Sequence, residues 1–260
     1  RWQTVRRRPA WPRQTEVMVF SGEQNPNRGQ QLAMELAPVL QLEDLVVAYP
    51  GSADPTLNGL TLSLQRGERL ALVGPSGCGK STVARAVLGL LPEGSRSQGR
   101  LELMVSDPRR LRRGALNRLR GEAVGLVFQD PMTRLNPLIS IGDHLRDTLS
   151  AHGAQAARAE ELLQRVGIGP ERMNSYPHQF SGGMRQRVAI ALAMALQPPL
   201  VIADEPTTSL DVAVAGQVMA ELTGLCQEAG SALLLITHDL AMAGRWCQRM
   251  AVMQDGRLLE

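Results

Sequence analysis

The sequence predicts an α/β protein built on a mostly parallel β-sheet with helices on both faces. It also predicts a small N-terminal antiparallel β subdomain and an inserted α-helical subdomain. Four short stretches are apolar throughout: 70–73, 124–128, 200–203 and 232–237. Strands of a parallel sheet have this composition when both of their faces are covered. Helix-like stretches alternate with them along the chain, which is the order of a βαβ fold.

Composition sets limits on the class of protein. The chain has 260 residues, of which 43% are hydrophobic and 20% are charged, so it can form one large domain without disulfide or metal crosslinks. Aromatic residues make up only 3%, which argues against a stacking platform for single-stranded nucleic acid. The net charge of +3 comes largely from arginines in 6–8 and 109–120. These suit nucleic acid or anionic lipid, but a disordered tail and a solvent-facing helix are the favoured interpretation.

The cysteines and the apolar stretches indicate where the protein works. Cys78, Cys226 and Cys247 are odd in number and lack metal-binding spacing, so free thiols in a reducing cytosol are expected. The N-terminus lacks the pattern of a secretory signal. The longest apolar stretch, 188–203, is interrupted at 197–199 and is too short to span a bilayer. We therefore expect a soluble, cytoplasmic protein that reaches the inner face of the membrane only through a partner.

The N-terminal part divides into a tail and a small sheet. Residues 1–38 are rich in Pro, Arg, Gln and Asn without a sustained period, so a flexible tail is expected there and a folded domain over 39–260. Strand patterns follow at 40–43, 45–49 and 60–64. The last of these alternates apolar and polar residues, which is typical of an antiparallel strand with one exposed face.

A glycine-rich loop follows the first apolar strand. Residues 74–81 read Gly-Pro-Ser-Gly-Cys-Gly-Lys-Ser, which is G-x-x-x-x-G-K-S between a strand and a helix. Glycines allow close approach to an anion, and backbone N–H groups at the helix N-terminus then bind phosphate. We expect ATP to be bound by Gly74, Pro75, Ser76, Gly77, Cys78, Gly79, Lys80, Ser81 and Thr82. Lys80 is expected to reach the β- and γ-phosphates, and the Ser81 hydroxyl to bind Mg²⁺.

Beyond this loop the elements follow in order. A helix over 82–91, a strand over 101–105 and a basic amphipathic helix within 109–120 precede the strand at 124–128. Residues 130–178 are more polar and mostly helical. With the next helix they predict a helical subdomain inserted at about 130–198.

The C-terminal third returns to the core. Ser181 is a suitable N-cap for a helix over 184–196. Helices are then expected over 212–228 and 240–247. The last residues predict a hairpin around Asp255-Gly256.

Polar residues follow directly after three of the apolar strands: Gln129, Asp204-Glu205 and His238. Ligands gather beyond the carboxyl ends of parallel strands, so these side chains are expected to converge on the phosphate loop. Asp204 suits the Mg²⁺ shell, and Glu205 suits a base that orients or deprotonates the attacking water. Gln129 suits a bridge between metal, water and the helical subdomain. His238 suits a hydrogen bond to the γ-phosphate.

These features together resemble the ATP-binding cassette (ABC) ATPases over residues 40–260. Phe180-Ser181-Gly182-Gly183-Met184-Arg185-Gln186-Arg187 resembles the family signature. The resemblance implies the ABC ATPase fold and an ATP held between two cassettes. Ser181, Gly182 and Gly183 would then contact the γ-phosphate of ATP on the partner. It also implies that Tyr49 stacks on adenine, that Ser209-Leu210-Asp211 crosses the dimer interface, and that Gln129 and His238 are the Q-loop and switch residues.

Longer motifs resemble the dipeptide, oligopeptide and nickel importer branch of this family. They are Phe128-Gln129-Asp130-Pro131-Met132, Leu135-Asn136-Pro137, Tyr176-Pro177-His178-Gln179-Phe180 and Ala203-Asp204-Glu205-Pro206-Thr207-Thr208. Three features depart from the branch: Arg134 in place of a small residue, the stretch 99–120, and an end at Glu260 without a C-terminal extension. Met184, where many cassettes have Gln, is common in the branch.

The resemblance implies catalytic roles for Glu205, His238 and Gln129, with Mg²⁺ held by Ser81, Gln129 and Asp204. The implied function is ATP hydrolysis that drives import of a peptide-like or nickel substrate. The implied partners are a second ABC ATPase subunit, in a homo- or heterodimer, transmembrane permease subunits and a substrate-binding protein, with no nucleic acid. Two alternatives remain: a soluble ABC ATPase in a nucleic-acid or phosphonate-metabolism complex, and a cassette that binds ATP without hydrolysing it.

Overall fold

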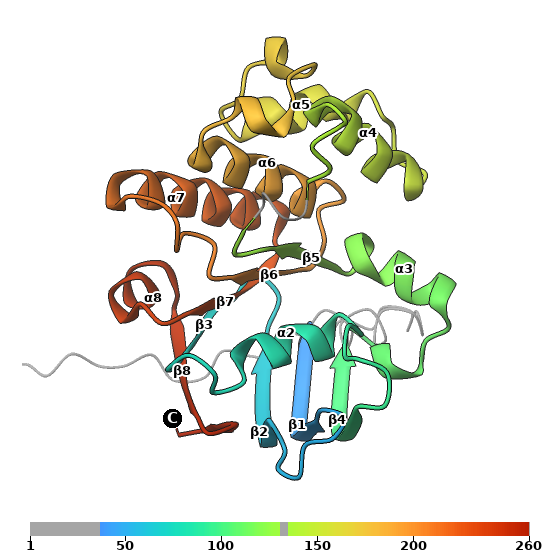
Figure 1. The fold of residues 1–260 in the computed structure, drawn as a ribbon, viewed down its shortest axis with the longest axis vertical. Helices are drawn as coiled ribbons and strands as arrows, with labels where there is room; N and C mark the ends of the chain where they lie inside the picture. The colour runs from blue at the N-terminus through green and yellow to red at the C-terminus, as the bar shows by residue number, and fades with distance from the viewer. Residues whose placement is uncertain (1–36, 131–134, 260) are drawn as a thin grey trace, which may run out of the picture. The chain divides into compact units, whose positions relative to one another are not determined.

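The computed structural model describes residues 37–130 and 135–259. They belong to one compact unit, Leu36–Glu260, whose elements are drawn in Figure 1. The tail expected over residues 1–38 lies almost wholly outside the described residues, as do Pro131, Met132 and Arg134 of the motifs quoted above.

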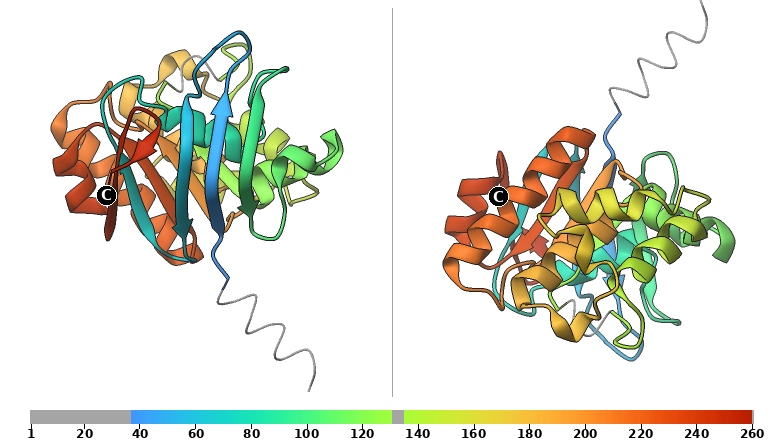
Figure 2. Two further views of the ribbon diagram at one scale, coloured as in Figure 1. Left: turned by 90° about the horizontal axis from the view of Figure 1, so that it is seen from below. Right: turned by 90° about the horizontal axis from the view of Figure 1, so that it is seen from above.

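The N-terminal strands form an antiparallel sheet of three strands in the order β2-β1-β4. They are β1 (Leu40–Ala48), β2 (Leu57–Leu64) and β4 (Arg96–Leu103), seen side by side in the left view of Figure 2. The two strand patterns expected at 40–43 and 45–49 are one strand. It continues through an irregularity at Asp44, whose φ is 47°. The irregularity adds a residue, so that Leu42 and Leu45 both face the core.

The second sheet has six strands in the order β5-β6-β7-β3-β8-β9. They are β5 (Val124–Val127), β6 (Leu200–Asp204), β7 (Ala232–Thr237), β3 (Arg69–Val73), β8 (Arg249–Gln254) and β9 (Arg257–Leu258). All neighbours pair in parallel except β8 and β9. The expected C-terminal hairpin is confirmed. The new finding is that its first strand also pairs with β3 and so extends the core sheet.

Helices cover both faces of this second sheet (Figure 1). Helix α2 (Lys80–Val87) packs with the antiparallel sheet on one face. The other face carries α6 (Gly182–Met194) and α7 (Val212–Ala229), with α4 (Ile141–Ala151) and α5 (Arg158–Arg165) beyond them. Helix α8 (Leu240–Trp246) lies against β3 and β7. Short 3-10 turns η1 (Pro108–Arg110), η3 (Pro170–Arg172) and η4 (Pro177–Gln179) connect longer elements.

The alternation of side chains along the central strands shows why these strands are apolar throughout. In β6, Leu200 and Ile202 belong to the hydrophobic core shared with α2 and the antiparallel sheet. Val201 and Ala203 belong to the core shared with α4 to α7. All four side chains are fully buried. Both faces of the sheet therefore need apolar residues, and the predicted α/β class is confirmed.

Two predicted elements are shifted. Helix α2 begins at Lys80 and ends at Val87, earlier than the expected span of 82–91. Strand β4 ends at Leu103 instead of Val105, because Met104 adopts a left-handed φ of 56° and starts a turn. The strand begins earlier, at Arg96, since its polar half pairs with β1 at the edge of the sheet.

A basic helix was expected within residues 109–120. In the structure this segment forms the 3-10 turn η1, followed by helix α3 (Arg113–Glu122). Arg109, held by Asp107, attaches this segment to β4. The Asp107 carboxylate accepts hydrogen bonds from Arg109 Nε at 2.9 Å and Nη2 at 2.8 Å, and Arg109 also donates to Ser97 Oγ and Gly99 O. Partial burial disfavours the Asp107 carboxylate, but the hydrogen bonds and charge of Arg109, with the charge of Arg110, outweigh it and lower the pKa of Asp107.

Replacement of Asp107 with alanine is expected to lower the free energy of unfolding by about 2 kcal/mol, because it leaves a half-buried guanidinium without its acceptor. A carboxyl with a lowered folded pKa stabilises the protein above its ordinary pKa of 3.8. The difference between the two proteins is therefore expected to vanish as the pH falls through the lowered value. Urea unfolding across this range tests the prediction, with the exposed Asp54→Ala as control. Equal destabilisation by both variants would contradict it.

Among the helices that the structure describes, none has the length and apolarity needed to cross a bilayer.

Candidate nucleotide site

Four neighbouring parallel strands bring the predicted site residues to one edge of the second sheet. The registers Val73–Thr237 between β3 and β7, Asp204–Ile236 between β6 and β7, and Val127–Ala203 between β5 and β6 place the four carboxyl ends at about one level. The phosphate loop (residues 74–81) follows β3, and the other candidate residues follow β5, β6 and β7. This edge is where an open α/β sheet binds its ligands.

The phosphate loop folds around its own lysine. Lys80 is only 6% exposed, and its Nζ donates to Gly74 O at 2.8 Å and Pro75 O at 3.0 Å. Glycine is required at two points of the loop by close approach. A Cβ on Gly74 would collide with the carbonyl oxygen of Met253, and one on Gly79 would lie 2.8 Å from Thr56 O. Gly79 also has a φ of 107°, which favours glycine.

An acidic side chain lies beside the start of α2. Asp204, the last residue of β6, accepts a hydrogen bond from the Ser81 hydroxyl. Burial raises the pKa of Asp204, the Ser81 hydrogen bond opposes this rise, and the neighbouring charge of Glu205 adds to it. The two side chains place a carboxylate and a hydroxyl oxygen together, which is a donor set that suits Mg²⁺.

Glu205 is held in an unusual backbone conformation next to His238. Its φ is 48°, and its backbone N–H donates to Ile236 O at 2.8 Å. His238 Nδ1 lies 3.1 Å from Glu205 Oε1, and Thr208 Oγ1 donates to Oε2 at 2.8 Å. Burial disfavours the carboxylate, but the bonds from Thr208 and His238 and the nearby positive charges outweigh it and lower the pKa of Glu205. The carboxylate is therefore ionised at neutral pH and can accept a proton.

Tyr49 comes from the other sheet and contacts the helix that follows the phosphate loop. It follows β1, is half-buried, and its hydroxyl lies 3.2 Å from Thr82 Oγ1. Arg85 Nη1 donates to the same hydroxyl at 3.3 Å. These contacts place the ring near the loop, where an adenine base attached to bound phosphates can reach it.

A second cluster combines the signature and the loop at 209–211. Ser181 caps α6 by accepting from Met184 N at 3.3 Å, which confirms the expected N-cap. A Cβ on Gly182 would lie 3.4 Å from Leu210 Cδ2, and one on Gly183 would lie 2.6 Å from Val214 Cγ1. The signature helix therefore packs directly on the residues that begin α7. Among the hydrogen bonds of the described residues, none joins Ser181–Gly183 to the phosphate loop.

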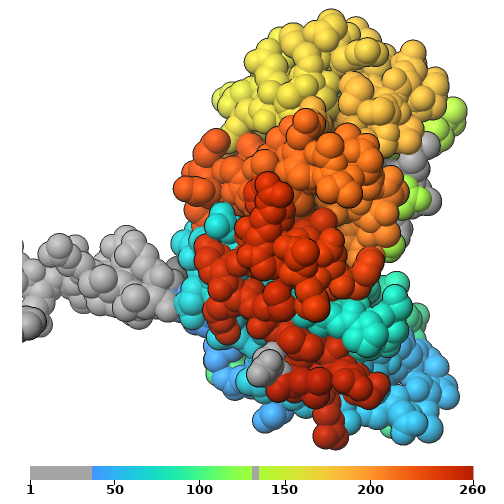
Figure 3. All heavy atoms as spheres, turned by 90° about the vertical axis from the view of Figure 1, so that its left-hand side faces the viewer, coloured from blue at the N-terminus to red at the C-terminus, as the bar shows by residue number. Residues whose placement is uncertain are grey.

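The loop at 209–211 is fixed by the start of α7. Asp211 caps this helix by accepting from Ala213 N at 3.1 Å and Val214 N at 3.0 Å, while Ser209 is exposed. A hollow of about 360 Å³ lies between α7 and α8 and is bordered by both Leu210 and His238. Figure 3 shows the face on which α7 (orange) and α8 (red) lie next to each other.

Gln129 is exposed two residues after β5, which ends at Val127 and not at the expected residue 128, and lies at the same edge of the sheet. Gln186 of the signature helix is 2% exposed, and its Nε2 donates to Phe128 O at 3.3 Å. The signature helix and the segment that carries Gln129 are therefore joined through one buried amide.

The structure thus places the expected residues in two groups. The first contains the phosphate loop, Tyr49, Thr82, Asp204, Glu205 and His238, with Gln129 at the same edge of the sheet. The second contains Ser181, Gly182, Gly183, Ser209 and Asp211. Sequence reasoning missed the contacts of Thr208, Arg85 and Gln186. Gln186 had a usable signal, because it shares a helix face with the apolar Ala189 and Ile190, where a polar side chain often makes a buried hydrogen bond.

The two signature glycines allow a matched test of the packing between α6 and α7. Gly183→Ala is expected to lower the free energy of unfolding by about 1–3 kcal/mol, because the new methyl overlaps the stiff side chain of Val214. Gly182→Ala makes only an ordinary contact with Leu210 and serves as the control. Thermal unfolding of both variants measures the difference. Equal effects would contradict the tight packing at Gly183.

The geometry at this edge is that of a P-loop nucleotide-binding protein. Comparison with known proteins gives the family. The family model described as ABC transporter matches residues 57–208. Among solved structures, the dimeric cassette MJ0796 bound to ADP and Pi has a TM-score of 0.75 at 30% identity, and the match covers 85% of this chain and 97% of that one. CbiO1 from Clostridium perfringens, part of the transporter complex cbiONQ, has a TM-score of 0.75 at 28% identity, covering 86% of this chain and 87% of that one.

Curated relatives are peptide-transport proteins. The chain is 42% identical over 235 residues to the oligopeptide transport ATP-binding protein OppD of Mycobacterium bovis, covering 86% of this chain and 38% of the relative. It is 40% identical over 233 residues to the dipeptide transport ATP-binding protein DppD of Bacillus subtilis, covering 85% of this chain and 70% of the relative. The chain therefore spans 38% of the length of the Mycobacterium relative. It belongs to the ABC transporter family, and the resemblance to the peptide-importer branch is confirmed.

Proposed function

We propose that this chain is the ATP-binding and ATP-hydrolysing subunit of an ABC importer that drives uptake of a peptide-like substrate through a partner permease. The observation that supports hydrolysis most directly is the contact between Glu205 and His238 at 3.1 Å, beside the phosphate loop. A cassette that only binds nucleotide would not need an ionised carboxylate held in this way. The peptide-like substrate is supported by the names of the relatives from Mycobacterium bovis and Bacillus subtilis.

Nucleotide binding begins at the phosphate loop. In this structure the Lys80 ammonium is bonded to two carbonyl oxygens of its own loop. Bound ATP would supply stronger, charged acceptors, so Lys80 turns from these carbonyls to the β- and γ-phosphates. Tyr49 would stack on the adenine ring. Its hydroxyl contacts with Thr82 and Arg85 hold the ring in place for this role.

The oxygen atoms of Ser81 and Asp204 fit a magnesium ion, since both lie together at the start of α2. Gln129 would complete this set from the end of β5. When bound, Mg²⁺ neutralises part of the charge on the β- and γ-phosphates.

Hydrolysis would proceed by attack of water on the γ-phosphorus, with cleavage of its bond to the β–γ bridging oxygen, so that ADP leaves. The Glu205 carboxylate orients this water and accepts its proton. His238 holds Glu205 through Nδ1 and presents its other ring nitrogen for a hydrogen bond to the γ-phosphate. Thr208 fixes the second carboxylate oxygen, so the base keeps one orientation.

A second cassette would complete the pocket. The N-terminus of α6 offers the Ser181 hydroxyl and the backbone N–H groups of Gly182 and Gly183 as an anion site. This site has no hydrogen bond to the phosphate loop of its own chain, so we assign it the γ-phosphate held by the partner. Ser209 and Asp211 lie beside it and would cross the same interface. The partner is a second copy or a relative, and a substrate-binding protein would deliver the cargo.

Coupling to transport would use the helical part of the chain, about 130–198. Gln129 links the nucleotide edge to this part, and Gln186 ties the signature helix to the same segment. Closure of two cassettes on ATP would therefore move the helical part together with the permease. The protein would act on the cytoplasmic face of the membrane, attached through the permease.

Purification of the affinity-tagged chain from its native membranes tests the proposal. We expect permease subunits to co-purify, and ATP hydrolysis by the complex to rise when peptide and a substrate-binding protein are supplied. Co-purification of DNA, RNA or a soluble enzyme complex in place of a permease would contradict the transport function.

A further inference from the structure

The segment from Val105 to Glu122 carries more positive charge than its packing uses. It contains six arginines and two acidic residues. Arg109 is bonded to Asp107, Ser97 and Gly99. Arg120 donates to Leu88 O and Gly89 O, both at 2.9 Å. These two arginines therefore have structural partners, and the remaining four need another explanation.

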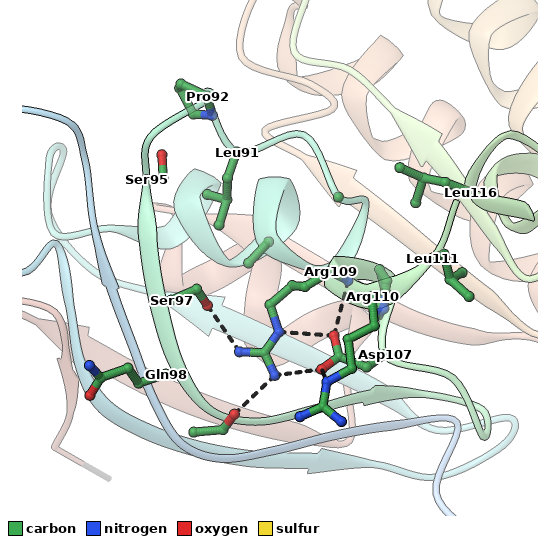
Figure 4. Close-up of a pocket in the computed structure, with 14 residues that line it drawn as sticks. Leu91, Pro92, Ser95, Ser97, Gln98, Asp107, Arg109, Arg110, Leu111 and Leu116 are labelled. Atoms are coloured by element: carbon green, nitrogen blue, oxygen red, sulfur yellow. Dashed lines mark hydrogen bonds and ion pairs between the residues drawn. The ribbon is translucent and has the colours of Figure 1, made fainter. Parts of the chain in front are cut away.

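The other four arginines are exposed: Arg110, Arg112, Arg113 and Arg118. We call them the basic surface. Arg110 has a side chain that is 85% exposed and pairs only through Nε with Asp107, at 3.4 Å. In the part of the chain that the structure describes, Arg112, Arg113 and Arg118 have no ion pair. Figure 4 shows Arg109 enclosed by its hydrogen bonds and Arg110 beside it.

Two members of the basic surface do not stabilise the helix at whose start they lie. Arg112 and Arg113 stand at the N-terminus of α3, which has no acidic residue in its first turn. Positive charges at this end oppose the helix dipole. Two further interruptions weaken the helix, since Arg120 and Gly121 leave helical geometry. The arginines are therefore unfavourable for local structure, and an anionic partner would reverse this effect.

Apolar groups accompany the charges. Val105 is 77% exposed at the turn before η1. The neighbouring Met104 and Ser106 line a hollow of about 380 Å³ together with Arg118. On the other side of α3, Leu91, Leu111 and Leu116 line a hollow of about 610 Å³ with Arg110 at its edge (Figure 4). Cations beside an exposed apolar side chain, here Val105, suit the interface of a lipid bilayer.

We propose that the basic surface binds the phosphate groups of anionic phospholipids, with Val105 entering the interface. Nucleic acid fits less well, because residues 90–122 include no aromatic side chain for stacking on bases. Helix α3 lies on the opposite side of the unit from α8 and the start of α7 in Figures 1 and 2. Lipid contact would therefore leave the nucleotide edge near His238 free. The inference relies on the proposed function only for bringing the chain to a membrane.

Co-sedimentation of the full chain with vesicles, in the absence of nucleotide, tests this surface. The vesicles consist of phosphatidylcholine alone or with about one third phosphatidylglycerol. We expect binding only to the anionic vesicles, weakened by salt. The triple variant Arg112→Gln/Arg113→Gln/Arg118→Gln is expected to bind about 100-fold more weakly, since each basic residue near an anionic surface changes the partition coefficient about fivefold.

Two control variants test whether the positive charge of the basic surface itself causes binding to the vesicles. Arg66→Gln/Arg172→Gln/Arg257→Gln removes the same charge from exposed positions elsewhere and should bind nearly as the parent does. Replacement of the same three surface arginines by lysine keeps the charge and should retain binding, whatever the glutamine variant does to folding. Because no nucleotide is present, failure of the proposed ATPase would not affect the result.

Any of five results would overturn the proposal. The first four are equal binding to both kinds of vesicle, unchanged binding of the glutamine variant, an equal loss in the control variant, and displacement by inorganic phosphate at the concentration of lipid phosphate. Preference for duplex DNA over anionic vesicles at equal phosphate concentration would also overturn it, because the surface would then serve nucleic acid.

Discussion

Replacing Lys80 with alanine is expected to weaken ATP binding by at least about 100-fold, because a charge-assisted contact to phosphate is lost from a site that excludes water. The structure makes this residue hard to replace. Its ammonium is buried within the phosphate loop and already bridges Gly74 O and Pro75 O, so no other cation occupies this point of the loop. Calorimetric titration of the variant with ATP and Mg²⁺ measures the loss.

The neighbouring cysteine provides a control within the same loop. Cys78 is buried and its sulfur lies 4.0 Å from Lys80 Nζ, but its expected contribution to ATP binding comes from its backbone N–H, which alanine retains. Cys78→Ala should therefore change ATP affinity only a few-fold. Thermal unfolding of both variants separates binding from folding. If Lys80→Ala bound ATP as tightly as the parent, the role given to the phosphate loop would be wrong.

The second large effect, on the rate of ATP hydrolysis, is expected for Glu205→Gln. The variant is expected to bind ATP normally and to hydrolyse it at least about 100-fold more slowly, because the amide cannot accept the proton of the attacking water. Glutamine has nearly the same shape, so the contacts with Thr208 and His238 can persist. Single-turnover hydrolysis in the purified complex, with ATP affinity measured beside it, separates chemistry from binding.

The same substitution at a remote site controls for this result. Glu228 is an exposed residue of α7 that pairs with Arg165. Glu228→Gln should leave ATP turnover unchanged. Turnover of Glu205→Gln close to that of the parent would show that another residue is the base, and the geometry around His238 would then need a different explanation.

Most of the fold follows from patterns that are local in the chain. Strands β6 and β7 were predictable because both faces of the sheet are covered, which leaves continuous apolar runs. The pattern was weaker at β4, where Arg96–Arg100 lies at the edge of its sheet and is largely exposed. The pairing of β8 with β3 was also missed. A hairpin is visible from its turn, but its neighbour in the sheet depends on residues far away in the chain.

The site also divides into features that local sequence predicts and features that depend on residues distant in the chain. The phosphate loop and the acid pair after β6 were predictable because strand order brings them to one edge. The contacts of Thr208 with Glu205, of Arg85 with Tyr49 and of Gln186 with Phe128 O depend on side chains that meet through space. No spacing in the sequence predicts them. The role of the signature in catalysis cannot be read from the contacts within one chain, because the proposed pocket needs two chains.

The rate of ATP hydrolysis per chain during dilution tests the central proposal most directly, namely that two chains enclose one nucleotide. The mass of the particles is measured in the same solutions. We expect turnover per chain to fall toward zero as the protein becomes monomeric, since a phosphate loop without a facing signature lacks half of its pocket. Undiminished hydrolysis by a strictly monomeric chain would contradict the proposal.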